Sequence, residues 1–131
     1  MTRHALTVHT AQYGYPGGDK LDITRKSGDH TFAPTWDLIN AAKRGHIDWP
    51  QYVEEYTQQM RASYRRNRPL WDLLLEAPRV VLVCFCPDPA YCHRTVLGKI
   101  LAKLGAHFYG EITVWDETET IEEPLFSRTG T

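Results

Sequence analysis

Five side chains that can do chemistry lie close together near the middle of the sequence: Cys84, Cys86, Cys92, His93 and Arg94. They include all three cysteines of the 131-residue chain. An odd number of cysteines at such short spacing does not resemble the disulfide framework of a secreted domain. It favours metal, redox or catalytic chemistry in a reducing compartment. The sequence therefore marks a candidate site between residues 84 and 94.

The first interpretation is an anion site at the start of a helix. Asp88 is a good N-cap and Pro89 suits the first helical position, so we expect a helix from about Pro89 to Leu104. Free N–H groups in the first turn and the positive end of the helix dipole attract phosphate or carboxylate. Arg94 could add a bidentate contact. This pattern predicts a site for a small anionic ligand.

A thiol in this position is also a candidate nucleophile. The field of the helix start should lower the pKa of Cys92, because it stabilises the thiolate. His93 and Asp22 are the candidate groups for proton transfer. The alternative is that Cys84 and Cys92 are simply small buried residues between a strand and a helix, since free cysteine is among the most buried residue types.

A second interpretation is a zinc site formed by Cys84, Cys86, Cys92 and His93. Cys84 and Cys86 lie on the same face of a strand, about 6.6 Å apart, which is close enough to share one metal ion. Cys92 and His93 are neighbours on the predicted helix and point about 100° apart. Both could bind the metal only if the helix began later than Pro89.

The alternation of strand and helix patterns predicts an α/β fold: one compact domain with a largely parallel sheet of about four strands, flanked by helices. The run of apolar residues from Val80 to Cys84 is typical of a strand buried on both faces. We expect the other strands at residues 5–10, 21–24 and 106–114, and the helices at residues 34–44, 49–67, 70–76 and 89–104.

Ligands of parallel sheets bind at the carboxyl ends of the strands. This rule brings further polar and reactive side chains to the same edge of the sheet as the cysteines. Together with Cys84, Cys86 and Arg94, the candidate ligand-binding residues from the loops after the first and second strands are His9, Tyr13, Arg25, Lys26 and Ser27.

Composition limits the possible partners. A net charge of −1 and a pI near 6.6 argue against a surface built as a whole for nucleic acid or anionic membrane. No apolar run approaches the roughly 20 residues of a membrane span. We expect a cytoplasmic protein with one α/β domain over residues 1–115 and an acidic, Thr-rich tail over residues 116–131.

The basic stretch Arg61–Arg68 leaves a third interpretation open, a nucleic-acid-binding or partner-binding module without catalysis.

The segment Leu82–Arg94, Leu-Val-Cys-Phe-Cys-Pro-Asp-Pro-Ala-Tyr-Cys-His-Arg, closely resembles the signature of the bacterial and phage family known as domain of unknown function 488. Residues 21–28 and 32–36 are similar to one branch of that family. One departure is Cys86, where many relatives carry Glu. The resemblance implies an intracellular α/β domain with a shared site at Cys84, Cys92, His93, Arg94, Asp22 and Arg25.

These observations predict a protein that binds or processes a phosphorylated or nucleotide-like ligand at the Cys-His-Arg helix start. Zinc is the possible cofactor. The alternatives are a structural zinc-binding protein and a nucleic-acid-binding or partner-binding module.

Overall fold

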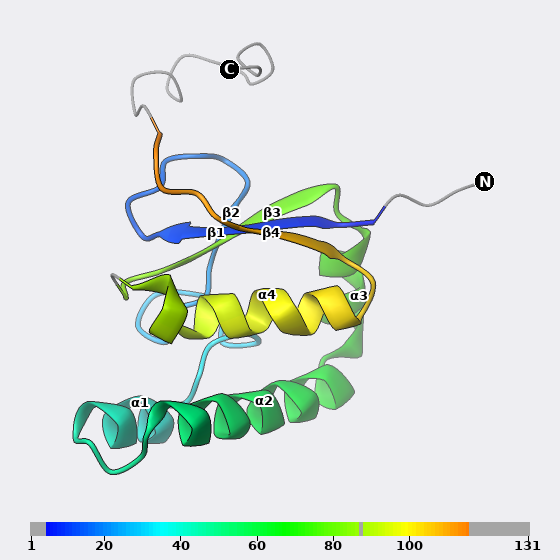
Figure 1. Cartoon of the computed structure of the whole chain (residues 1–131). Helices are drawn as coiled ribbons and strands as arrows, with labels where there is room; N and C mark the ends of the chain where they lie inside the picture. Colours follow the sequence, from blue (N-terminus) through cyan, green and yellow to red (C-terminus); the bar gives the residue numbers. More distant parts are fainter. Residues whose placement is uncertain (1–4, 87, 116–131) are drawn as a thin grey trace.

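The computed structural model describes residues 5–86 and 88–115, which form a parallel sheet with α-helices packed against it (Figure 1). The expected tail over residues 116–131 lies outside the described residues. The α/β class and the parallel sheet of about four strands are confirmed. In chain order the elements are β1 (Thr7–Gln12), β2 (Lys20–Asp22), α1 (Trp36–Lys43), α2 (Trp49–Arg66), α3 (Arg68–Glu76), β3 (Arg79–Cys84), the 3₁₀ helix η1 (Pro89–Tyr91), α4 (His93–Lys103) and β4 (His107–Glu111).

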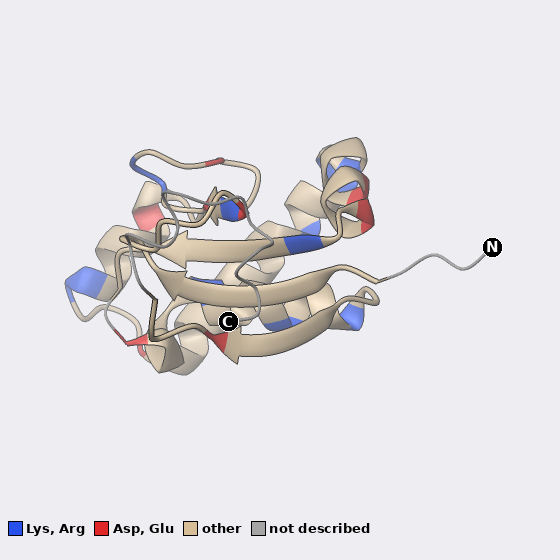
Figure 2. Ribbon diagram, turned by 90° about the horizontal axis from the view of Figure 1, so that it is seen from above, with Lys and Arg blue, Asp and Glu red and all other residues tan. Residues whose placement is uncertain are grey.

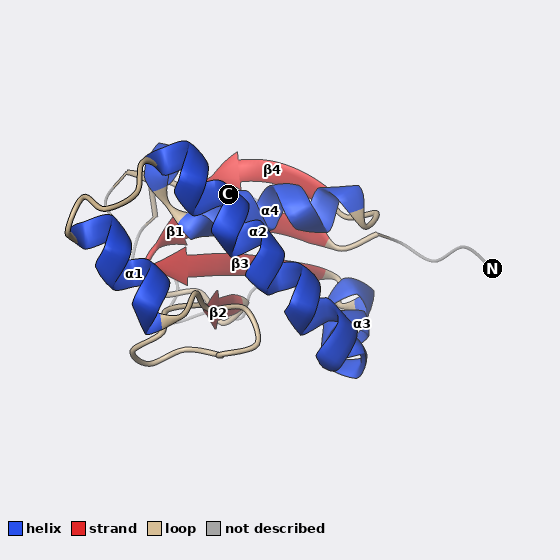
Figure 3. Cartoon of the chain, turned by 90° about the horizontal axis from the view of Figure 1, so that it is seen from below, coloured by secondary structure: helices blue, strands red, loops and turns tan. Residues whose placement is uncertain are grey.

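The four strands are all parallel and lie in the order β2-β3-β1-β4. Helix α4 packs against one face of the sheet, and α2 lies beyond α4, with α1 beside it (Figures 1 and 3). The opposite face is covered by the loop after β1 and by the segment after β4 (Figure 1). Because the strands are parallel, their carboxyl ends meet at one edge, where η1 and the start of α4 also lie.

Strand β3 is the centre of the hydrophobic core. Val80 and Leu82 belong to the main cluster on the helix-covered face, whereas Val81 and Val83 pack with Ala11 on the other face. The strand is therefore buried on both sides, as its run of apolar residues predicts. Charged residues lie mainly on helices and loops, and few lie on the strands (Figure 2).

The longest helix, α2, begins and packs as its sequence predicts. The Asp48 side chain accepts the backbone N–H of Gln51, and the Gln51 side chain accepts the N–H of Asp48, which forms a capping box. Tyr52, Tyr56 and Met60 form the buried stripe. Within residues 5–86 and 88–115, no helix has the length and hydrophobicity of a membrane span.

The start of α4 differs from the prediction. Asp88 does act as a cap, but its side chain accepts the N–H of Ala90 and caps only the short η1. Cys92 then takes an extended conformation, with φ −135° and ψ 145°, and α4 begins at His93. The reason is that Cys92 is itself the N-cap, since its sulfur accepts the N–H of Arg94 at 3.5 Å. Sequence rules do not favour cysteine as a cap.

The edge strand β4 is shorter than predicted and contains a β-bulge. Val8 pairs with Phe108 and His9 pairs with Gly110, so Tyr109 has no partner on β1. Gly110 adopts a φ of +104°, which glycine accepts without strain. The extra residue shifts the alternation of side chains, and Glu111 therefore faces the helices, as Phe108 does. The other predicted boundaries agree to within two residues.

Candidate functional site

A pocket of about 450 Å³ opens at the carboxyl edge of the sheet, between the strand ends and helices α1 and α2. Its volume is within the range of small-molecule sites. The loop after β2, the end of β3 and the turn before α4 form its floor, and mostly apolar and aromatic residues form its walls. The lining residues are Thr24, Arg25, Lys26, Trp36, Ile39, Ala42, Lys43, Ile47, Asp48, Trp49, Tyr52, Cys84, Phe85, Cys86, Tyr91, Cys92 and His93.

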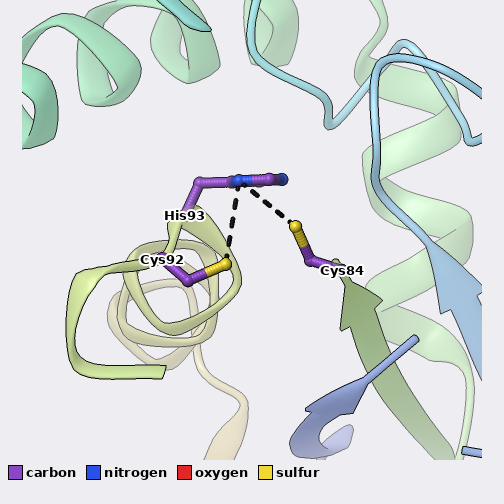
Figure 4. Close-up of side chains that lie close together, drawn as sticks. All are labelled: Cys84, Cys92 and His93. Atoms are coloured by element: carbon purple, nitrogen blue, oxygen red, sulfur yellow. Dashed lines mark hydrogen bonds between the residues drawn. The ribbon is translucent and has the colours of Figure 1, made fainter. Parts of the chain in front are cut away.

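Cysteine and histidine side chains converge at the floor of this pocket. The Nδ1 atom of His93 lies 3.8 Å from the sulfur of Cys84 and 4.0 Å from that of Cys92 (Figure 4). The potential ligand atoms of these three buried residues all lie within 4.8 Å of one another. Cys86, which is only partly buried, places its sulfur 4.0 Å from that of Cys84. We call these four residues the Cys/His cluster.

The hydrogen bond on the far side of the His93 ring fixes which nitrogen faces the sulfurs. Nε2 lies 2.9 Å from the carbonyl oxygen of Ile23, and since a carbonyl only accepts, Nε2 carries the proton. Burial lowers the pKa of His93, which favours the neutral ring. The unprotonated Nδ1 therefore points at the thiols of Cys84 and Cys92.

The three thiols hold their protons unequally. Hydrogen bonds from Cys84 and then Cys92 lower the pKa of Cys86 far below its ordinary value. The hydrogen bond to Cys86 raises the pKa of Cys84, and hydrogen bonds to Cys84 and Cys86 raise that of Cys92. Cys86 therefore ionises first. The expectation that the helix start lowers the pKa of Cys92 is wrong, because a thiol that donates to a neighbouring thiolate keeps its proton.

Arg94 does not line the pocket. Its side chain is fully buried, and Nε and Nη2 donate to the carboxylate oxygens of Glu111 at 3.0 and 2.9 Å. Nη1 donates to the carbonyl oxygen of Cys86 at 2.8 Å. The guanidinium group thus connects β4 to the segment after β3. The predicted contact between Arg94 and a bound anion would require it to leave these partners.

Comparison with known families identifies the chain. The sequence matches DUF488-N3a, described as the active DUF488-N3 subclade, over residues 22–105, which is well over half of the chain. The chain belongs to the DUF488-N3a family. The resemblance based on the Cys-His-Arg motif is thereby confirmed. No curated protein and no solved structure matches the chain to a significant level.

In this DUF488-N3a chain, six of the residues predicted for the site line the pocket: Arg25, Lys26, Cys84, Cys86, Cys92 and His93. Other predicted residues lie elsewhere. His9 stacks on Tyr109, and alternation along β1 puts it on the face of the sheet opposite to the cluster. Tyr13 stacks on Phe85, and its hydroxyl lies 3.3 Å from that of Ser27, outside the pocket lining.

Asp22 shapes the loop after β2. Its carboxylate accepts hydrogen bonds from the hydroxyl of Ser27, at 2.6 Å, and from the hydroxyl and N–H of Thr24. Burial raises the pKa of Asp22, but these hydrogen bonds outweigh it and the pKa lies below its ordinary value. The carboxylate is therefore a weak base. It positions the neighbouring residues 24–26 at the pocket, whereas its predicted role in proton transfer stays a prediction.

Sequence patterns predict neither the aromatic walls of the DUF488-N3a pocket nor the partner of Arg94. Trp36 is 49% exposed and Tyr91 is 62% exposed, although both are large apolar side chains. Trp36 belongs to a predicted helix and Tyr91 follows the central strand, and neither position indicates that the two side chains line one pocket. Glu111 lies 17 residues after Arg94, and only the bulge in β4 turns it inward.

Proposed function

We propose that this protein binds one zinc ion at the Cys/His cluster, on the floor of the pocket. The observation that carries this proposal is the convergence of the sulfurs of Cys84 and Cys92 with the unprotonated Nδ1 of His93, all within 4.8 Å of one another. The sulfur of Cys86 lies 4.0 Å from that of Cys84 and could supply the fourth ligand. A Cys₃His donor set is one of the common structural zinc sites. Cys86 is the most exposed of the four ligands, so the ion would border the pocket on the side of Cys86.

Three ligand–ligand distances within the cluster support a tetrahedral ion. Bonds of about 2.3 Å to sulfur and 2.0 to 2.1 Å to nitrogen place sulfur ligands about 3.8 Å apart, and sulfur and nitrogen about 3.6 Å apart. The distances of 4.0 Å between Cys84 and Cys86, and of 3.8 and 4.0 Å from His93 to Cys84 and Cys92, are close to these values. The objection from the predicted helix start no longer applies, because Cys92 precedes α4 in extended backbone.

The groups around the cluster also support a metal site. Ligating histidines usually donate their second ring N–H to a carbonyl or carboxylate, as His93 does to Ile23. The N–H of Arg94 points to the sulfur of Cys92, and the positive end of the α4 dipole favours thiolate there once a cation replaces the protons. Arg94 holds the carbonyl of Cys86 in place.

Metal analysis of the purified full-length chain tests the proposal. We expect about one zinc per chain after reconstitution, with release of protons on binding, because thiols must ionise. Cys84→Ser, Cys92→Ser and His93→Asn should each lose most of the zinc, whereas His46→Asn, at an exposed histidine, should keep it. Because a cysteine variant could fail to fold, zinc titration of the wild-type chain against a chelator is the second measurement. Zinc well below one equivalent in that titration would exclude the site.

A second candidate function is the binding of a small phosphorylated, nucleotide-like ligand in the same pocket. The observation that favours it is Arg25, whose Nε atom is buried and has no hydrogen-bond partner among residues 5–86 and 88–115. Lys26 and Lys43 add positive charge to the lining, and Trp36 and Trp49 offer flat apolar surfaces. An aromatic base would stack on the tryptophan rings, and an anionic group would pair with the basic side chains.

Calorimetry with a nucleoside monophosphate, its nucleoside and inorganic phosphate tests this second function. The monophosphate should bind more tightly than either part, and Arg25→Ala should weaken its binding about tenfold or more, since a charge-assisted hydrogen bond is worth about 1.5–3 kcal/mol. Arg44→Ala, at an exposed arginine outside the pocket, is the matched control. Equal affinity of the Arg25→Ala variant and the wild type would rule out this role of Arg25.

A further inference from the structure

A second pocket, of about 470 Å³, lies between α2 and α4 and is separate from the cluster. Its floor is apolar and includes Val53, Met60, Trp71, Val96 and Ile100. We call it the α2/α4 groove. Helices α2 and α4 pack directly on each other (Figure 3), and residues of both helices line the groove.

The rim of the α2/α4 groove is basic. Arg61 and Arg65 line it from α2, and Lys99 and Lys103 line it from α4, whereas no Asp or Glu of residues 5–86 and 88–115 belongs to the lining. All four cations are exposed, and within the described residues none of them forms an ion pair. An occupant that matches this surface must present apolar side chains to the floor and carboxylates to the rim.

We propose that the α2/α4 groove binds the acidic C-terminal segment of the same chain, residues 116–131. This segment contains five acidic residues and one basic residue; its apolar residue Ile121 lies between acidic ones, and Leu125 and Phe126 follow two and three positions after the last of them. Its charge is opposite to that of the rim, and its apolar residues suit the floor. The chain as a whole is nearly neutral, so this pairing of charges is local.

The segment starts at the edge of the sheet that borders one end of the groove, but on the opposite face, because Trp115 packs against Tyr15 there. It must therefore pass around this edge to reach the groove. Strands β3 and β4 are parallel, so the described chain leaves the sheet after Glu111 at the same edge where β3 leads into η1. Ala90 of η1 and Trp49 line one end of the groove. Sixteen residues follow Trp115 and can span up to about 50 Å, whereas an 11-residue helix such as α4 is about 16 Å long.

An apolar floor favours this peptide over nucleic acid as the occupant. A phosphate backbone would satisfy the four cations but would leave the apolar floor without a partner. Trp49 lines both the groove and the first pocket, and its ring stacks on that of Tyr52. A segment bound in the groove would therefore contact a wall residue of the candidate site.

Hydrogen exchange of the full-length chain, read by mass spectrometry, tests the proposal. Backbone amides of residues 119–127 should exchange more slowly than an unstructured peptide. Reversal of two rim charges, Arg61→Glu with Arg65→Glu, should speed their exchange by about tenfold, as expected from the loss of two ion pairs and the gain of repulsion. Glu122→Lys with Glu123→Lys should do the same, and all four changes together should restore the slow exchange. Arg44→Glu with Arg66→Glu alters the same charge outside the groove and should leave exchange unchanged.

Three results would overturn the inference. The first is exchange of residues 119–127 at the unprotected rate in the wild-type chain. The second is protection that the rim reversal does not change. The third is protection that grows with protein concentration, which would assign the groove to another copy of the chain.

Discussion

The pair formed by Arg94 and Glu111 offers the sharpest test of how the site is held together. The sequence motif suggests that Arg94 contacts the ligand, whereas the structure shows it buried against Glu111. We predict that Glu111→Gln, which leaves the arginine charge buried, destabilises the fold by about 3–5 kcal/mol, the usual cost when one partner of a buried pair is removed.

The magnitude follows from the contacts. Arg94 makes three hydrogen bonds of 2.8 to 3.0 Å, two to the Glu111 carboxylate and one to the Cys86 carbonyl. Charge-assisted bonds of about 1.5–3 kcal/mol each would sum to more than this range, but bonds within one network are not additive. A loss of about 3–5 kcal/mol is large for a domain with a total stability of about 5–15 kcal/mol.

Urea unfolding, followed by tryptophan fluorescence and circular dichroism, measures this loss. Arg68→Met, in the exposed pair with Asp72, is the matched control and should cost less than about 1 kcal/mol. If Glu111→Gln remains within about 1 kcal/mol of the wild type, and Arg94→Lys abolishes ligand binding without loss of stability, the structural role given to Arg94 is refuted.

Three further predictions concern single residues. Gly98→Ala should destabilise by about 1–3 kcal/mol in urea unfolding, because the new Cβ would lie 2.7 Å from the ring of Phe108. Tyr56→Phe should lower the free energy of unfolding by about 1–3 kcal/mol in the same assay, since it removes the 2.7 Å hydrogen bond from the Tyr56 hydroxyl to the carbonyl of Phe32. Asp22 has a lowered pKa, so its stabilising contribution is present above its ordinary pKa of 3.8 and is lost as the pH falls through the lower pKa of the folded state. Asp22→Asn should therefore be less stable than the wild type at neutral pH and should lose less stability on acidification, as urea unfolding at both pH values would show.

The sequence predicts the fold well because local patterns determine it. The apolar run from Val80 to Cys84, the cap at Asp48 and the stripe that contains Tyr52 and Met60 each have one physical explanation, and the structure agrees with them. The convergence of the cysteines with His93 at one sheet edge also follows from the strand-to-helix order.

The site's details depend on features that no sequence rule ranks. The N-cap of α4 is Cys92 and not Asp88. Cys92 therefore lies outside the helix, next to Cys84 and His93. The relative pKa values of the three thiols depend on the hydrogen bonds between their sulfurs, which only the three-dimensional structure shows. The pocket walls come from helices far apart in sequence, so neither Trp36 nor Trp49 could be assigned to it beforehand.

The bulge at Tyr109 determines whether the buried charge of Arg94 has a carboxylate partner. If the same sequence paired with β1 without a bulge, the side chain of Glu111 would point to the opposite face of the sheet, and Arg94 would be left with a buried charge and no carboxylate. Loss of Tyr109 alone would instead remove the bulge and leave Glu111 opposite Thr10, on the same face of the sheet as Arg94. We expect related sequences that lack the extra residue to keep the buried pair, with the carboxylate two positions after the residue equivalent to Phe108 and not three.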